Sequence, residues 1–329
     1  MTIDYPASRR PQPLDYALPV SFRTIDELEG ALRDADYLPD RGLATALFLS
    51  LALEKPLLLE GEAGVGKTEA AKALATALPA RLIRLQCYEG LDVSHAVYEW
   101  NYPRQLLHIR AAQEGTVSED ELFGAEFLIR RPLLEAIDSD ERVVLLIDEV
   151  DRADEEFEAF LLEVLSDFQI TIPELGTIKA RRKPAVVLTS NRTRELHDAL
   201  KRRTLFHWIG HPSLEREVDI VRLRVPGIPE RLAAEAAGFV RGLRGLDLAK
   251  PPGVAETIDW AQALAALGRE EIDAEVVEQT LGSVLKYRED IEAVRDETLV
   301  GLIEEARADD LLLALERRVV DPVVEAAAL

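Results

Sequence analysis

The stretch that decides the fold reads Gly61-Glu62-Ala63-Gly64-Val65-Gly66-Lys67-Thr68. It has the form G-x-x-x-x-G-K-T, in which glycines let backbone N–H groups approach phosphate oxygens, the lysine reaches them and the threonine hydroxyl meets Mg²⁺. The apolar run 56–60 suits a buried parallel strand, and the Ala-rich run 69–78 has helical spacing. A strand feeds the loop and a helix leaves it, so the unpaired amides of the helix N-terminus face the phosphates. The sequence predicts a nucleotide-binding loop.

Two carboxylates follow the strongest strand signal, the apolar run 143–147. Acidic side chains at the C-terminal end of a buried parallel strand are positioned to face a ligand there. Asp148 can hold Mg²⁺ together with Thr68, and Glu149 can polarise a water for in-line attack on a γ-phosphate. The run 185–190 predicts another buried strand, and Asn191 at its end can orient the same water. The sequence thus predicts phosphoryl chemistry at one edge of a sheet.

Composition limits the class of protein. The chain has 329 residues, enough for two domains, and a formal net charge of −22, a field that repels phosphate backbones and argues against nonspecific nucleic-acid binding. No apolar run approaches the ~18 residues that span a bilayer. Cys87 is the only cysteine, which excludes an internal disulfide and a cysteine-based zinc site. We expect a cytoplasmic protein with no membrane or nucleic-acid partner.

The remaining segments are predicted in chain order. Residues 1–20 carry four prolines and predict an extended or disordered arm. Helical patterns begin at Thr24 and Arg41, and between them Tyr37 and Leu38 form either the wall of an adenine site or a plain core contact. We predict strands over 81–86 and 205–209, a helix over 154–165 and a hairpin over 168–179. Residues 88–129 are irregular and predict a helix interrupted by an insertion around Trp100, and the chain is helical from residue 211.

The order of these motifs resembles that of the AAA+ ATPases from Phe22 to Ile209. The insertion before the Asp148 strand, the hairpin before the Asn191 strand and the run 148–153 resemble the MoxR family. The runs 198–203 and 285–288 are most similar to members encoded beside metalloenzymes. The resemblance implies an α/β fold, a P-loop NTPase parallel sheet with helices on both faces, followed by an all-α lid domain. The expected division is the arm 1–20, an AAA+ nucleotide-binding domain 21–210, and a helical lid with acidic C-terminal helices 211–329.

The resemblance also implies a role for each site residue. ATP would be bound by Tyr37, Leu38, Gly61, Glu62, Ala63, Gly64, Val65, Gly66, Lys67, Thr68 and Glu69. Lys67 and Thr68 are the Walker A pair and Asp148 and Glu149 the Walker B pair, with Mg²⁺ held by Thr68 and Asp148. Asn191 corresponds to sensor 1. Arg203, or alternatively Arg202, is the arginine finger that acts on a neighbouring subunit. The sequence departs from the family at 253–258, where the sensor 2 arginine is missing.

The function that the resemblance implies is ATP hydrolysis coupled to remodelling of a client protein during metallocofactor insertion or activation. The expected assembly is a homo-oligomeric ring, a hexamer, with a von Willebrand factor A domain protein and a metalloenzyme client as partners. Exposed aromatic and apolar residues around Trp100 and on the hairpin 168–179 would grip a polypeptide, or else pack within the subunit.

Three alternatives stay open. A nucleic-acid motor is disfavoured by the acidic charge, and a restriction-type GTPase by the lack of an Asn-Lys-x-Asp run in the sequence. A nucleotide-binding scaffold without turnover is disfavoured by the intact Asp148-Glu149 pair.

Overall fold

A computed structural model describes residues 22–111, 119–295 and 297–327, so the arm predicted over 1–20 lies outside the described residues. Its centre is a parallel sheet whose strands follow the order β2-β5-β8-β1-β9. The strands are β1 (Leu57–Gly61), β2 (Arg81–Gln86), β5 (Val143–Asp148), β8 (Ala185–Ser190) and β9 (Leu205–Ile209). The apolar runs predicted to be buried strands are confirmed as the middle of this sheet.

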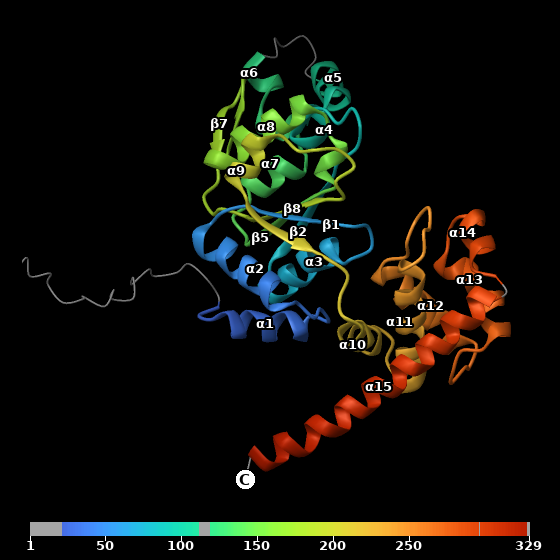
Figure 1. Ribbon diagram of the computed structural model, residues 1–329. Helices are drawn as coiled ribbons and strands as arrows, with labels where there is room; N and C mark the ends of the chain where they lie inside the picture. Colours follow the sequence, from blue (N-terminus) through green and yellow to red (C-terminus); the bar gives the residue numbers. More distant parts are fainter. Residues whose placement is uncertain (1–21, 112–118, 296, 328–329) are drawn as a thin grey trace, which may run out of the picture.

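Helices cover both faces of the sheet, as predicted (Figure 1). Strand alternation places Leu57 and Leu59 on one face, and Leu58 on the other. The first face packs on α1 (Ile25–Asp34), α2 (Arg41–Leu53) and α3 (Lys67–Ala77). The second face packs on α7 (Pro132–Ile137) and α8 (Glu155–Asp167). The α/β class with a parallel sheet and helices around it is therefore confirmed.

The insertion differs from its prediction. It comprises α4 (Val93–Ala96), β3 (Tyr98–Trp100), α5 (Tyr102–Ala111), α6 (Glu119–Leu122), the 3₁₀ helix η1 (Ala125–Phe127) and β4 (Leu128–Arg130). Strands β3 and β4 pair antiparallel, which the sequence analysis did not predict. The Trp100 ring is only 7% exposed and packs edge-on against Phe123 with centroids 5.0 Å apart. Trp100 itself therefore packs within the subunit, which is the alternative left open for it, whereas Tyr102, Leu106 and Leu107 on the adjacent α5 are 59%, 59% and 66% exposed.

The hairpin is confirmed as β6 (Gln169–Ile172) paired with β7 (Gly176–Lys179). Its apolar side chains Ile170 and Ile172 are buried, so the exposed apolar face expected of this hairpin is absent at these two positions. Leu175 at the tip is 37% exposed. Within the hairpin, a surface that grips a polypeptide would therefore lie at the tip.

A helical region follows the sheet, beyond the short α9 (Asp198–Arg203) that precedes β9. It contains α10 (Leu214–Arg224), α11 (Glu230–Arg244), α12 (Val254–Ala266), α13 (Ala274–Val284), α14 (Arg288–Ala293) and α15 (Glu297–Ala327). Its own core holds the Phe239 and Trp260 rings, with the indole N–H donating to Thr280 Oγ1 at 2.8 Å. Within the described residues, no helix is long and apolar enough to cross a membrane.

Candidate nucleotide-binding site

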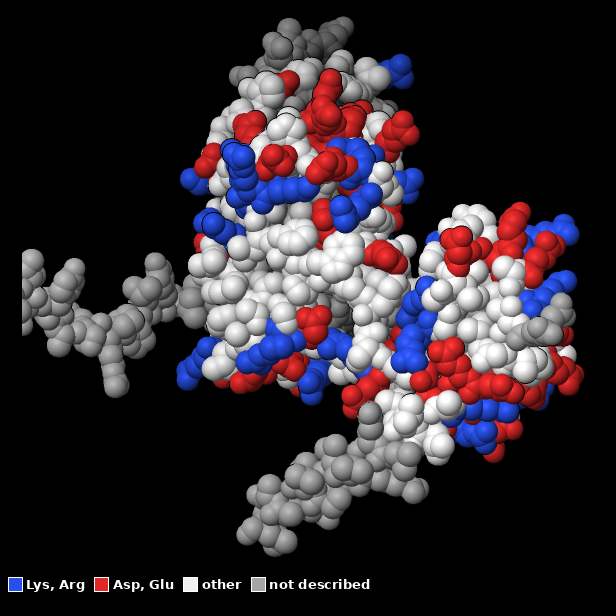
Figure 2. All heavy atoms as spheres, in the orientation of Figure 1, with Lys and Arg blue, Asp and Glu red and all other residues white. Residues whose placement is uncertain are grey.

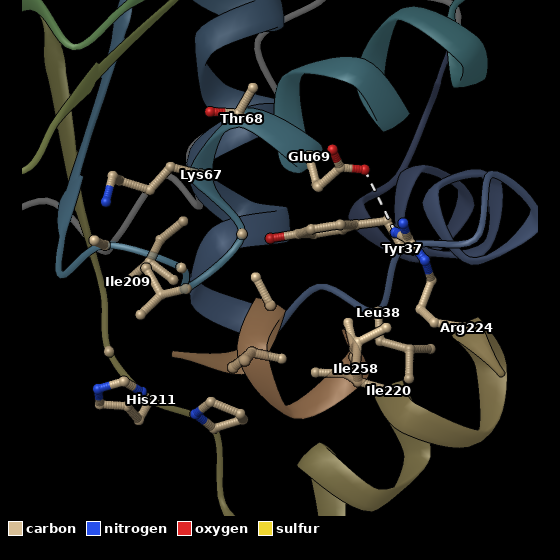
Figure 3. Close-up of a pocket in the computed structure, with 18 of the residues that line it drawn as sticks. Tyr37, Leu38, Lys67, Thr68, Glu69, Ile209, His211, Ile220, Arg224 and Ile258 are labelled. Atoms are coloured by element: carbon tan, nitrogen blue, oxygen red, sulfur yellow. Dashed lines mark hydrogen bonds and ion pairs between the residues drawn. The ribbon is translucent and has the colours of Figure 1, made fainter. Parts of the chain in front are cut away.

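A cavity of about 680 Å³ lies at the C-terminal edge of the sheet where the helical region meets it. Its lining comes from the segment between α1 and α2, the loop before α3, the ends of β5, β8 and β9, and helices α10 and α12. Figure 3 shows the same meeting of segments, with Lys67 and Thr68 on one side and Ile220 and Arg224 on the other. A cavity of this size suits a small ligand such as a nucleotide.

The loop 61–68 has the backbone that phosphate binding requires. Gly64 and Gly66 have φ angles of 79° and 94°, a left-handed region that glycine adopts without strain. Helix α3 begins at Lys67, so its first amides face the loop. The Lys67 ammonium donates to the carbonyls of Gly61 and Glu62 at 2.8 and 2.5 Å. Burial lowers the pKa of Lys67, while nearby carboxylates act in the opposite direction.

The residues proposed to hold Mg²⁺ are brought together. The Thr68 hydroxyl donates to Asp148 Oδ1 at 3.0 Å across 80 residues of sequence. Thr189 Oγ1 donates to the same oxygen at 2.5 Å, and Arg84 Nε donates to Asp148 Oδ2 at 3.0 Å. A hydroxyl beside a carboxylate is an oxygen donor set that Mg²⁺ accepts when substrate phosphates complete it. The residues therefore fit the ion, and Thr68 and Asp148 are the ones that would hold it.

Glu149 sits at a strained point directly after β5. Its φ is 54°, an uncommon left-handed conformation for a non-glycine residue and one that clusters at functional sites. Its Oε2 atom accepts from Gln86 Nε2 at 2.9 Å and from Arg152 Nη1 at 3.2 Å. Its backbone N–H donates to Thr189 Oγ1 at 2.9 Å. The carboxylate is thus held at the cavity wall by the neighbouring strand β2.

Asn191 lines the cavity directly after β8, where the sequence analysis placed it. Its backbone N–H donates to Asp151 Oδ1 at 3.2 Å, and that of Thr193 donates to Asp151 Oδ2 at 2.8 Å. Asp151 lies in the 3₁₀ helix η2 (Val150–Arg152) and is 1% exposed. A buried carboxylate therefore ties the loop after β8 to the segment that follows Glu149.

Tyr37 and Leu38 both line the cavity, next to apolar side chains from two helices of the helical region. Figure 3 shows Leu38, Ile220 and Ile258 gathered on one side of the Tyr37 ring, whose hydroxyl points toward the glycine loop. A β-carbon built on Gly66 would lie 3.7 Å from Tyr37 Cε2. Burial raises the pKa of the Tyr37 hydroxyl above its ordinary value. These apolar groups can receive a nucleobase.

The helical region reaches the cavity through polar contacts that the sequence analysis missed. Arg224 on α10 pairs with Glu69 at 3.4 Å, and Arg216 donates to the Leu38 carbonyl at 2.7 Å. His211 Nε2 lies 2.9 Å from Glu62 Oε2. Two arginines therefore stand near the site although none occurs at 253–258. The sequence shows that both arginines fall within one helical segment, but it does not show that this helix packs beside the nucleotide cavity.

The start of α12 touches the phosphate loop directly. The backbone N–H of Ala255 donates to the Gly64 carbonyl at 3.2 Å. A β-carbon on Gly253 would lie 2.7 Å from the Ala63 carbonyl oxygen and 2.8 Å from Gly64 Cα. Only a glycine allows this approach without a shift of backbone.

Arg84 and Gln86 on β2 are further site residues that sequence reasoning missed. The register pairs Gln86 with Asp148, and strand alternation places Arg84 on the same face as Gln86. The available signal in the sequence was that the predicted strand 81–86 ends in polar residues although the rest of it is rich in β-forming residues. Arg202 and Arg203, in contrast, are exposed on α9 and do not line this cavity, so they do not face the site of their own chain.

Comparison with known proteins finds similarity over the part of the chain that holds the phosphate loop and the sheet. Residues 56–204 match the family model described as an AAA domain of the dynein-related subfamily. The ClpA homolog protein of Fuscovulum blasticum is 29% identical over 179 residues, covering 51% of this chain and 20% of that protein. The chaperone protein ClpB 2 of Parasynechococcus marenigrum (strain WH8102) is 36% identical over 137 residues, covering 41% of this chain and 13% of that protein. The chain thus spans a fifth or less of the length of these curated relatives.

Among solved structures, a RuvB mutant of Thermotoga maritima aligns with a TM-score of 0.46 and 19% identity, covering 79% of this chain and 72% of that one. This likeness is too distant to bear on function. Residues 56–204 are thus similar to an AAA domain, and the loop, the carboxylate pair and the parallel sheet agree with that likeness.

Proposed function

We propose that this chain binds and hydrolyses ATP and couples hydrolysis to the remodelling of a client protein. One observation carries the proposal: Lys67, Thr68, Asp148, Glu149 and Asn191 come from three separate segments and line a single cavity. A site for binding alone would need the loop, whereas the paired carboxylates and the amide are the groups that hydrolysis requires.

Each side chain has a distinct task in this proposal. The Lys67 ammonium exchanges the Gly61 and Glu62 carbonyls for phosphate oxygens when the nucleotide binds. Glu149 accepts the proton of the attacking water, and Asn191 orients that water. Thr68 and Asp148 would hold Mg²⁺, which would neutralise charge on the phosphates. Gln86 and Arg152 fix the Glu149 carboxylate, so they set how readily it turns toward the water.

The proposal includes assembly into a ring, taken as a hexamer. Arg203, with Arg202 as the alternative, would stabilise transition-state charge at the nucleotide of a neighbouring copy, because neither side chain lines its own cavity. The site of each copy would then be complete only beside another copy.

The client is proposed from the family resemblance. The Clp relatives include a protein named as a chaperone, which supports a role in protein remodelling. Similarity of the runs 148–153, 198–203 and 285–288 to MoxR proteins supports a metalloenzyme client and a partner with a von Willebrand factor A domain. A cytoplasmic location is part of this proposal, since ATP is supplied there.

Phosphate release by the purified full chain tests the proposal. We expect Mg²⁺-dependent release from ATP, and no nucleotide binding by Lys67→Ala, because the buried Lys67 ammonium is the cation that the phosphate loop itself places in the cavity. Arg222→Ala, which removes an exposed ion pair outside the cavity, is the matched control. ATP binding without release by the wild-type chain at any protein concentration would establish the scaffold alternative.

The client part needs a separate test. Deleting the hairpin tip 173–176 should reduce activation of a client more than it reduces basal ATP hydrolysis. Equal loss of both activities would assign the hairpin a purely structural role.

A further inference from the structure

A second cavity, of about 360 Å³, lies at the opposite edge of the sheet from the nucleotide site. The first residues of β5 and β8, Val143 and Ala185, line it, whereas the nucleotide cavity lies where these two strands end. Since β5 has six residues and a strand rises ~3.3 Å per residue, roughly 20 Å of sheet separate the two cavities. The second cavity is therefore a separate place on the molecule, which the proposed ATP hydrolysis does not use.

Basic side chains dominate the lining of this second cavity. Among the described residues that line it, Glu54 is the only acidic one, whereas five are basic: Lys55, Arg142, Arg181, Arg182 and Lys183. The chain as a whole has the opposite balance, with 61 acidic against 39 basic residues. On the face that Figure 2 shows, Asp and Glu side chains lie over both the sheet and the helical region, with Lys and Arg among them. We call the hollow lined by these five residues the basic cavity.

The order of the strands brings the basic residues together. Lys55 comes just before β1, Arg142 just before β5, and the run 181–183 just before β8. These three strands are parallel neighbours, with β8 between the other two, so the residues that precede them meet at one edge of the sheet. The sequence alone shows the run 181–183 as basic, and the fold adds the other two side chains to it.

Two of the five cations already pair with acidic side chains, but only weakly. Arg181 lies 2.9 Å from Asp140, and Lys183 lies 2.8 Å from Glu54. All four side chains are between 41% and 79% exposed, and ion pairs this exposed contribute little to stability, so a ligand can replace the acidic partners.

The other three cations are more directly available. Lys55 and Arg182 are exposed, and within the part of the chain that the structure describes neither takes part in an ion pair. Arg142 is partly buried, and its Nη1 donates to the Leu78 carbonyl at 3.0 Å, which holds the guanidinium at the cavity wall. A ligand with several negative charges would complete this set of donors.

The surroundings of the cavity favour carboxylates over phosphates or nucleotides. Helices α2 and α3 border it with their C-terminal ends, where the helix dipole is negative, so neither helix offers the free N–H groups that cradle a phosphate. No aromatic ring is found among the described lining residues, so nothing there stacks on a nucleobase. Cations that come from three segments match negative charges that are spaced along a chain.

We propose that the basic cavity binds an acidic peptide segment, rich in Asp or Glu, of a partner protein. The apolar side chains Leu51, Leu78 and Val143 also line the cavity, and they can pack on the methylene groups of Glu side chains while the carboxylates meet the cations. The net charge of −22 repels an acidic peptide from the rest of the surface. Affinity for such a peptide therefore has to come from a local basic site.

A labelled hexaglutamate peptide tests the proposal by fluorescence anisotropy with the full chain, without nucleotide, at ~0.1 M salt, where long-range repulsion is screened. Wild type should bind, and Lys55→Glu/Arg182→Glu should weaken binding by about tenfold or more, because two cations become anions. The control Arg23→Glu/Lys250→Glu reverses one exposed Arg and one exposed Lys outside the cavity, so the net charge changes equally. Its affinity should stay within about twofold of wild type.

Two further variants separate charge from folding. Lys55→Arg/Arg182→Lys keeps both charges and should keep the affinity. If Lys55→Glu/Arg182→Glu has a lower melting temperature by circular dichroism, Lys55→Ala/Arg182→Ala takes its place, with an expected loss of about threefold or more. No binding of the peptide by wild type, or equal loss in the reversal variant and its control, would overturn the proposal.

Competition experiments identify the occupant. Unlabelled hexaglutamate should displace the labelled peptide, and uncharged hexaglutamine should not. Displacement by inorganic triphosphate at a lower concentration than hexaglutamate would assign the cavity to a phosphate ligand and overturn the peptide. Self-association that is lost in Lys55→Glu/Arg182→Glu, measured by sedimentation velocity, would make the occupant a second copy instead of a partner. Because binding is measured without nucleotide, a chain that fails to hydrolyse ATP would refute the ATPase function and leave this test intact.

Discussion

The two sides of the nucleotide cavity are built in different ways. On the sheet side, Asp148 at the end of β5 accepts hydrogen bonds from Thr68 at the start of α3 and from Thr189 on the adjacent parallel strand β8. On the helical side, α10 and α12 approach through a few contacts, such as Arg224 with Glu69 and the Gly253 backbone against Gly64. The parallel register fixes the first set within a buried sheet, whereas the second set depends on how a separate group of helices docks. We infer that the sheet side performs the chemistry and the helical side adjusts nucleotide affinity.

The largest expected effect on ATP hydrolysis tests whether one copy of the chain contains every catalytic group, or needs an arginine from a neighbouring copy. Arg203→Ala should lower the rate of ATP hydrolysis by roughly 10³-fold or more, because an arginine finger stabilises charge that develops only in the transition state. Steady-state phosphate release at a protein concentration that permits assembly measures this. Mixing Arg203→Ala with Glu149→Gln chains should recover part of the activity, since intact sites form where a wild-type arginine faces a wild-type glutamate. If Arg202→Ala shows the loss instead, the finger is Arg202, and if neither does, each copy is self-sufficient.

The next effect isolates the chemical step on the sheet side. Glu149→Gln keeps the size of the side chain but removes the proton acceptor, so kcat should fall by about 10²-fold or more while ATP still binds. Calorimetric titration for binding and phosphate release for turnover measure the two quantities separately. Glu155→Gln, at the exposed start of α8, is a control of identical chemistry. Unchanged turnover in Glu149→Gln would remove the assignment of Glu149 as the base.

The third prediction turns to the helical side. Gly253→Ala places a β-carbon against the backbone of Ala63 and Gly64 and should weaken nucleotide binding by about tenfold, since overpacking costs ~1–3 kcal/mol. Gly282→Ala on α13 is the matched control, because nothing lies within 4 Å of its added β-carbon. Fluorescent nucleotide titration distinguishes them. A fall in kcat with unchanged affinity would break the proposed division between chemistry and affinity.

The smallest effect concerns the ion pair between the two sides. Arg224→Ala removes a partly exposed pair with Glu69, and should weaken nucleotide binding only about twofold to fivefold, the range of exposed ion pairs. Arg222→Ala on the same helix loses a similar exposed pair with Glu230 and should change nothing at the site. A loss of 100-fold or more in hydrolysis by Arg224→Ala would instead give Arg224 the transition-state role of the missing sensor 2 arginine.

Much of the sheet side could be predicted from the sequence. The loop, the strand that feeds it and the strand that ends in Asp148 and Glu149 are local patterns, each written in consecutive residues. Neighbouring C-terminal ends of parallel strands meet at one edge, so Asn191 could be placed beside them. The insertion resisted prediction because its two short strands pair across 28–32 residues of sequence, and burial of Trp100 depends on that pairing.

By itself, then, the sequence determined the phosphate loop, the carboxylate pair and the alternation of strands and helices, because each of these depends on the spacing of nearby residues. Only the tertiary structure decided which polar groups hold the carboxylates, since Arg84 and Gln86 reach Asp148 and Glu149 through the register of β2 with β5. It also decided that α10 supplies the arginines near the site and that Trp208 is exposed while Trp100 is buried. These outcomes depend on strand order and helix docking, which bring together residues far apart in the chain, so no local pattern is sufficient to predict them.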